Sequence, residues 1–143
     1  MVYNTFVIRS CAGSGQASFE VILMRESGEM YLETILILFN RRGYVRSIDV
    51  AEEMGLSRPS VSRGMAKLRE SECILMGADG MITLTEKGRD IAEKIYERHR
   101  VLSQLFISLG VDEETATEDA CRIEHVISDK TFAAIKARIN QSG

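Results

Sequence analysis

The stretch that most limits how this chain can fold is residues 47–85, where two helical patterns precede a hairpin pattern. "SIDVAEEMG" predicts a short helix from about Ser47 that ends at Gly55. "SRPSVSRGMAKLRES" predicts a second helix, because Ser57 is a favourable N-cap and proline is tolerated in a first turn. "CILMGADGMITLT" has two short apolar runs around a glycine-containing turn, which is typical of a hairpin. This order of elements predicts a winged helix-turn-helix.

The second of these helices has one apolar face and one polar face. Val61, Met65 and Leu68 recur at helical spacing, so we expect them to be buried. The other positions offer hydroxyls and cations that can bind phosphates or base edges. These candidate DNA-binding residues are Ser57, Arg58, Pro59, Ser60, Ser62, Arg63 and Lys67. The alternative is a helical hairpin whose charges are simply solvated.

Charge is distributed unevenly along the chain, whose formal net charge is only −3 over 143 residues. Residues 41–69 carry seven basic and three acidic side chains, whereas residues 111–130 carry seven acidic and two basic ones. The first segment suits contact with phosphates and the second suits a cation. The three cysteines (Cys11, Cys73 and Cys121) are too scattered for a disulfide framework, which favours a reducing cytoplasm.

Further helices are predicted on both sides of the winged helix. "SGEMYLETILILFNRRG" predicts a first helix that ends at Gly43, and Thr85 caps a long helix that Gly110 stops. Two more helices follow, with Asp112 and Ser128 as caps, the first of them running through "DEETATEDACRIEHVI". The predicted fold is mainly α: a winged helix-turn-helix in residues 24–85, then a helical domain in residues 86–143. Residues 1–23 read as a flexible extension, with Met24 as an alternative start, and a short extra strand or helix in this segment is the alternative.

Residues 119–129, "DACRIEHVISD", place Cys121, Glu124 and His125 on one helical face. Thiolate, carboxylate and imidazole are ligands for divalent transition metals, and His99 on the long helix could join them. Met30 and Glu33 form a second pair three residues apart. The alternatives are a core methionine, a buried cysteine and a hydrogen-bonded histidine. An enzyme is a further alternative, either a metal-dependent hydrolase or one with a Cys121–His125 nucleophile and base, but no oxyanion element or glycine-rich loop accompanies that pair.

Several segments together resemble the diphtheria toxin repressor family of iron- and manganese-dependent repressors, in its short, two-domain form. The matching segments, in order, are "EMYLETI", "SRPSVSRGMAKL", "ITLTEKG", "RHRVL" and "DACRIEHVISD". The resemblance implies a winged-helix DNA-binding domain followed by a metal-binding and dimerisation domain.

The resemblance also implies a set of metal ligands. Met30, Cys121, Glu124 and His125 match the regulatory site of the iron branch, and His99 matches a second site in both branches. Glu33 matches a carboxylate ligand of the manganese branch. Ser103 and Thr117 stand where the iron branch has a Glu and a His, so that ancillary site is not expected in its iron-branch form.

The expected function is therefore a cytoplasmic, homodimeric repressor that controls metal homeostasis genes. It would bind a palindromic double-stranded DNA operator when loaded with Fe²⁺ (preferred) or Mn²⁺, with other divalent transition metals as mimics in vitro. No catalysis, membrane association or small-molecule substrate is expected. A winged-helix regulator with an organic effector is the alternative. We expect the dimer to bury part of the segment from Asp112 to Ile139, including Ile123, Val126, Ile127, Phe132, Ile135 and Ile139.

Overall fold

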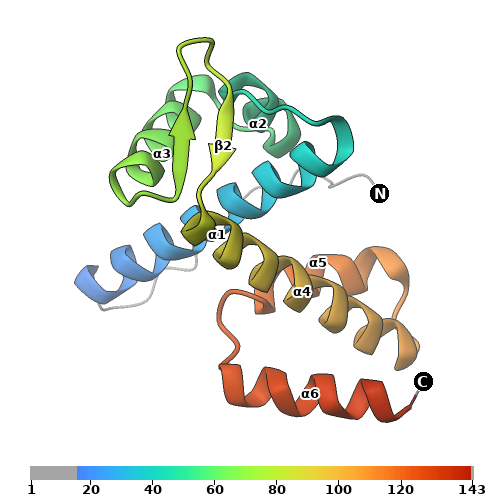
Figure 1. The fold of residues 1–143 in the computed structure, drawn as a ribbon. Helices are drawn as coiled ribbons and strands as arrows, with labels where there is room; N and C mark the ends of the chain where they lie inside the picture. Colours follow the sequence, from blue (N-terminus) through green and yellow to red (C-terminus); the bar gives the residue numbers. More distant parts are fainter. Residues whose placement is uncertain (1–15, 143) are drawn as a thin grey trace. The chain divides into compact units, whose positions relative to one another are not determined.

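The computed structural model of the chain describes residues 16–142 (Figure 1). It divides into two compact units, one that ends at Ala92 and one that begins at Glu93. The elements in chain order are α1 (Gln16–Arg42), α2 (Ser47–Met54), α3 (Arg58–Glu70), β1 (Ile74–Met76), β2 (Ile82–Leu84), α4 (Glu86–Ser108), α5 (Glu113–Ile123) and α6 (Asp129–Gln141). The predicted fold class, mainly α with an N-terminal winged helix-turn-helix, is confirmed.

The N-terminal unit contains the helix-turn-helix in α2 and α3. Gly55 ends α2 in the left-handed conformation (φ 64°), which glycine adopts without a steric penalty. Ser57 then caps α3 by accepting a hydrogen bond from the Ser60 N–H at 3.3 Å, and Pro59 lies in the first turn. The predicted stripe of α3 is buried together with apolar residues of α1 and α2. The largest fully buried members of this core are Leu32, Ile35, Leu38, Val50, Val61 and Met65.

The wing is the predicted hairpin. Strands β1 and β2 pair antiparallel, with Ile74 opposite Leu84 and Met76 opposite Ile82. The segment before α2 joins them, because the Ile82 N–H donates to the Val45 carbonyl at 2.7 Å. Alternation places Ile74 and Ile82 in the core and leaves Leu75 63% exposed. The wing is therefore attached to the same core as α3.

The start of α4 fits closely against the end of α3 and β1. Thr85 caps α4, accepting a hydrogen bond from the Gly88 N–H at 3.1 Å and donating one to the Glu72 carbonyl at 2.7 Å. A Cβ atom on Gly88 would lie 1.9 Å from the Cys73 carbonyl oxygen. Glycine is thus required here by a close approach of two backbones, which the sequence alone did not reveal.

The first helix begins earlier than expected. We predicted a flexible extension over residues 1–23, but α1 begins at Gln16, so residues 16–23 are helical in the structure. "QASFEVIL" holds good helix formers and no proline, so it can extend the following helix by propagation without a new nucleus. The rest of the predicted extension lies outside the described residues.

The C-terminal unit consists of α4 from Glu93, α5 and α6. Asp112 and Ser128 cap α5 and α6 as predicted, accepting from the N–H groups of Thr115 at 2.9 Å and Thr131 at 3.2 Å. The Thr115 hydrogen bonds lower the pKa of Asp112. Its buried apolar residues are few: Ile95, Leu102, Ala116, Ala120 and Phe132. In the described part of the chain, no helix has both the length and the apolarity to cross a membrane.

The residues expected at a dimer interface differ in exposure. Phe132 is buried within the chain at 8% exposure, whereas Val126 is 64% exposed. The four isoleucines named above are half-buried. Leu109, just after α4, is 71% exposed and adds to the uncovered apolar surface. A second subunit over this surface remains a prediction.

Candidate metal centre and DNA-binding surface

Helix α5 ends earlier than the sequence predicted. We expected it to run through Ile127, but it ends at Ile123, and Glu124 is its C-cap with helical backbone angles (φ −55°, ψ −30°). The β-branched residues Ile123, Val126 and Ile127 lower helix propensity after Arg122, which favours an end of the helix in this segment. The Glu124 N–H still donates to the Ala120 carbonyl at 2.9 Å, so Cys121 and Glu124 keep their helical spacing. His125 lies in the turn that follows.

Three of the predicted ligands meet in the C-terminal unit. The side-chain donor atoms of His99, Cys121 and Glu124 all lie within 4.8 Å of one another. His99 Nδ1 is 2.8 Å from Glu124 Oε2, and His125 Nε2 is 3.2 Å from Glu124 Oε1. The centre thus gathers imidazole nitrogen, thiol sulfur and carboxylate oxygen around Glu124. This donor set can bind Fe²⁺, Zn²⁺ or a related transition metal.

The environment of Glu124 tests whether these residues fit a cation. Its side chain has no exposure, and His99 is buried at 3% exposure. Within residues 16–142, Glu124 Oε1 accepts no hydrogen bond, although His125 Nε2 lies 3.2 Å from it. Burying a carboxylate oxygen without a hydrogen bond is costly unless a cation neutralises it. The residues therefore fit a bound divalent metal.

A residue that the sequence did not single out, Arg98, holds the turn that begins at Glu124 and contains His125. Its Nη1 donates to the carbonyls of Glu124 at 3.0 Å and Ile127 at 2.8 Å, and its Nη2 binds the Asp129 carboxylate. The guanidinium lies over the Phe132 ring, 5.4 Å from its centroid. The hydrogen bond and charge of Lys94, with a smaller effect of Arg98, lower the pKa of Asp129. The only sequence feature that pointed to Arg98 was its position next to the candidate ligand His99 in "ERHR".

The other predicted ligands lie in the N-terminal unit. Met30 and Glu33 stand three residues apart on α1, Met30 half-buried and Glu33 buried. Ser103 and Thr117, at the ancillary positions, are both half-buried, and Ser103 Oγ makes no hydrogen bond within the described part of the chain. The roles of Met30 and Glu33 as ligands stay predictions. Cys73 and Cys121 form no disulfide among the described residues.

The polar face of α3 is exposed as expected for a DNA-binding surface. Six of the seven candidates are exposed, and the seventh, Ser60, is half-buried. Arg63 donates to Ser60 Oγ at 3.3 Å, and Ser57 Oγ donates to the same oxygen at 2.9 Å. This surface offers hydroxyls and cations at the start of a helix, where the backbone dipole also favours phosphate.

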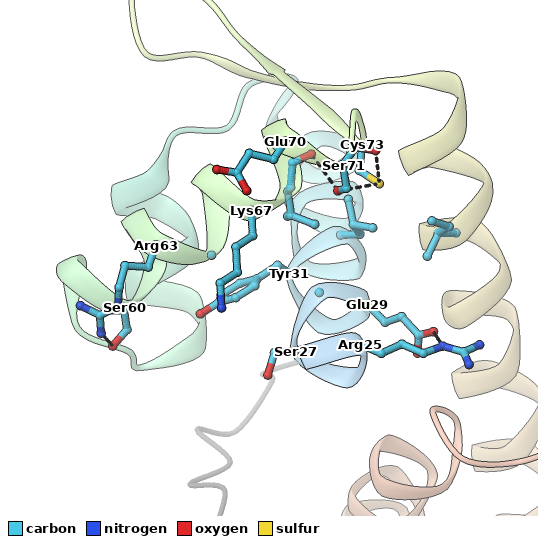
Figure 2. A pocket seen from close by; sticks show the side chains of 15 residues that line it. Arg25, Ser27, Glu29, Tyr31, Ser60, Arg63, Lys67, Glu70, Ser71 and Cys73 are labelled. Carbon is cyan, nitrogen blue, oxygen red and sulfur yellow. Dashed lines mark hydrogen bonds and ion pairs between the residues drawn. The ribbon is translucent and has the colours of Figure 1, made fainter. Parts of the chain in front are cut away.

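A pocket of about 900 Å³ lies beside α3, between that helix and α1 (Figure 2). The Tyr31 ring packs against α3 at Gly64, where a Cβ atom would lie 2.4 Å from ring atom Cε2. Burial raises the pKa of Tyr31, and the charge of Arg63 lowers it to a smaller extent. Arg25 lies at one end of the pocket and is paired with Glu29 at 3.2 Å. The close contact of Tyr31 and Gly64 sets the distance between α1 and α3.

Both halves of the chain match known families. Residues 23–75 match "Iron dependent repressor, N-terminal DNA binding domain", and residues 85–142 match "Iron dependent repressor, metal binding and dimerisation domain". The transcriptional regulator MntR of Geobacillus kaustophilus is 36% identical over 102 residues, which cover 71% of this chain and 72% of that protein. MntR of Bacillus velezensis is 35% identical with the same coverage.

Solved structures agree with these matches. A manganese-dependent transcriptional repressor in complex with manganese superposes with a TM-score of 0.73 at 29% identity, over 79% of this chain. The manganese regulator SloR superposes with a TM-score of 0.71, also at 29% identity. The chain spans about half of the length of these two proteins, 52% and 53%. The chain belongs to the iron-dependent repressor family, a family of metal-dependent transcriptional repressors rather than enzymes.

Proposed function

We propose that this protein is a cytoplasmic repressor that binds a palindromic operator as a homodimer when the centre around Glu124 is loaded with metal. The observation that carries the proposal is the fully buried Glu124 carboxylate beside His99 and Cys121, with one oxygen lacking a hydrogen bond within residues 16–142. The exposed hydroxyls and cations of α3 would bind the DNA. The proposal that the regulated genes serve metal homeostasis rests on the family resemblance and not on these residues.

The candidate ligands have different proposed roles. Cys121, Glu124 and His125 would hold the ion, and His99 would serve this ion or a second one. Met30 and Glu33 are proposed as further ligands from the family resemblance alone. A bound ion supplies a positive charge that neutralises the buried carboxylate and thiolate. His99 orients Glu124 through the 2.8 Å contact to Oε2. Because the ligands must be deprotonated, metal affinity should rise with pH.

We propose Fe²⁺ as the preferred metal, although the two solved structures named above are of manganese-dependent regulators. Thiolate and thioether are soft ligands, whereas Mn²⁺ prefers oxygen donors. Cys121 and Met30 therefore favour Fe²⁺, with Co²⁺, Ni²⁺ or Zn²⁺ as mimics in vitro. The double variant Met30→Asp, Cys121→Glu should shift the response towards Mn²⁺. A wild-type response to Mn²⁺ at a lower free concentration than to Fe²⁺ would contradict this preference.

The proposed function is tested by DNA binding under anaerobic conditions. A duplex selected in vitro for binding to the metal-loaded protein serves as the probe, and its affinity is measured at fixed salt with EDTA, Fe²⁺ or Mn²⁺. We expect tight binding only with metal, and loss of the metal effect in Glu124→Gln. Glu113→Gln, an exposed carboxylate in the first turn of α5, is the matched control and should respond like wild type. Equal affinity with and without metal would refute the proposal.

A further inference from the structure

Two consecutive residues of α4 hold opposite ends of Glu124. His99 contacts its carboxylate at 2.8 Å, and Arg98 donates to its main-chain carbonyl at 3.0 Å. Arg98 also donates to the Ile127 carbonyl at 2.8 Å, so the turn from Glu124 to Ile127 is held at both ends. The Arg98 side chain is only 7% exposed, so water competes little for these bonds.

The turn needs such a partner because α5 has no glycine at its end. Helices commonly end in a left-handed glycine whose backbone satisfies the last carbonyls, but here Glu124 is the C-cap and His125 follows it. A guanidinium offers several donors in a rigid plane, which a lysine ammonium does not. Its positive charge also suits the negative end of a helix.

We propose that Arg98 is a positioning residue for the metal centre, which presets the backbone of Glu124 and His125 before the metal binds. This inference rests on the proposed function, and it adds a residue that does not touch the metal. Partners of metal ligands commonly change metal affinity by about 10–100-fold when they are removed. Arg98 acts on the carbonyl side of the ligand, whereas His99 acts on the carboxylate.

The test compares Arg98→Lys with Lys94→Gln. Lys94 also binds Asp129, at 2.9 Å, but no interaction joins it to the carbonyls of Glu124 or Ile127 among those found in the described residues. Amide exchange of residues 124–128 is measured on the metal-free proteins, and Co²⁺ affinity is measured by the thiolate-to-cobalt absorption. Arg98→Lys should lose protection in this segment and bind Co²⁺ about 10–100-fold more weakly. Lys94→Gln should match wild type in both measurements.

Three outcomes overturn the proposal. Unchanged protection and Co²⁺ affinity in Arg98→Lys would show that the carbonyl contacts do not position the ligands. Loss of protection throughout α6 as well would show a general structural role. An equal loss in Lys94→Gln would assign the effect to Asp129 instead. If the wild-type protein binds no Co²⁺, the proposed function fails, but the exchange measurement still decides whether Arg98 positions the turn.

Discussion

The two units of this chain bury different kinds of residue. The N-terminal unit has an apolar core of leucine, isoleucine, valine and methionine from α1, α2, α3 and the wing, and Glu33 is the one charged side chain buried in its described part. The C-terminal unit buries Arg98, His99 and Glu124 among only a few apolar side chains. Apolar burial stabilises a fold by itself, whereas buried charges contribute little net stability even when they are paired. The first unit therefore has the composition of a scaffold, and the second has that of a site which a ligand completes.

The largest expected effect comes from removing the charges of the C-terminal unit. If they serve metal binding rather than stability, the double variant His99→Leu, Glu124→Leu should bind no metal and yet be at least as stable without metal. Replacing a buried charged pair by apolar residues is often neutral or stabilising by about 1–4 kcal/mol. Urea unfolding in EDTA measures this difference. A clear loss of stability would show that the pair is structural, and would remove the contrast between the units.

In the N-terminal unit, adding one methyl group at a close contact should be destabilising. Gly88→Ala would place Cβ 1.9 Å from the Cys73 carbonyl oxygen, and a backbone atom cannot move away easily. We expect a loss of about 3 kcal/mol, the upper part of the usual range for overpacking. In the control Gly28→Ala, Cβ would meet Leu68 Cδ2 at an ordinary 3.8 Å, so the helix should gain about 0.5–1 kcal/mol. Thermal unfolding compares the two, and equal effects would contradict the packing argument.

DNA binding should depend on α3 and not on the C-terminal surface. Arg63→Ala should weaken binding of the selected duplex by about 1–3 kcal/mol if Arg63 contacts a base. If it contacts a phosphate, the salt dependence should fall by about one unit of slope. Lys130→Ala, an exposed cation at the start of α6, should change neither quantity. Affinity measured over a range of salt separates these results. An affinity and salt dependence of Arg63→Ala equal to those of wild type would show that Arg63 does not contact the DNA.

The smallest expected effects come from two matched helix caps. Ser57 and Ser128 accept hydrogen bonds from Ser60 N–H at 3.3 Å and Thr131 N–H at 3.2 Å. Either serine-to-alanine change should cost about 1 kcal/mol in the metal-free protein. Ser57→Ala should also weaken DNA binding, because Ser57 begins the recognition helix, whereas Ser128→Ala should not. Equal effects on DNA binding would show that the caps act on the whole chain.

Local signals predicted most of the N-terminal unit. Helices and strands begin and end at residues with local conformational preferences, here Gly55, Ser57, Pro59 and the glycines of the wing. These preferences depend only on neighbouring residues. The close approach at Gly88 was not predicted, because it depends on a carbonyl fifteen residues away in sequence.

The candidate metal centre could be predicted only in part. Cys121 and Glu124 keep the predicted helical spacing, and the His99 side chain lies close to both, as expected. The early end of α5 has a local cause in its β-branched residues, which the helical spacing of the ligands outweighed in the prediction. The role of Arg98 could not be predicted, because it arises from hydrogen bonds to carbonyls 26 and 29 positions away in sequence. Arginine on a helix is usually a solvated surface residue, and no neighbouring residue indicated that Arg98 is buried.

The central claim is that metal binding stabilises the C-terminal unit through the buried centre. The most direct measurement is amide exchange of both units at increasing free Fe²⁺ or Co²⁺ without oxygen, in wild type and in Glu124→Gln. At free metal about 100 times the dissociation constant, wild type should gain about 2.7 kcal/mol of stability. The gain should include residues of α5 and the turn to Ile127, and Glu124→Gln should lose it. No gain in wild type, or an equal gain in the variant, would contradict the claim.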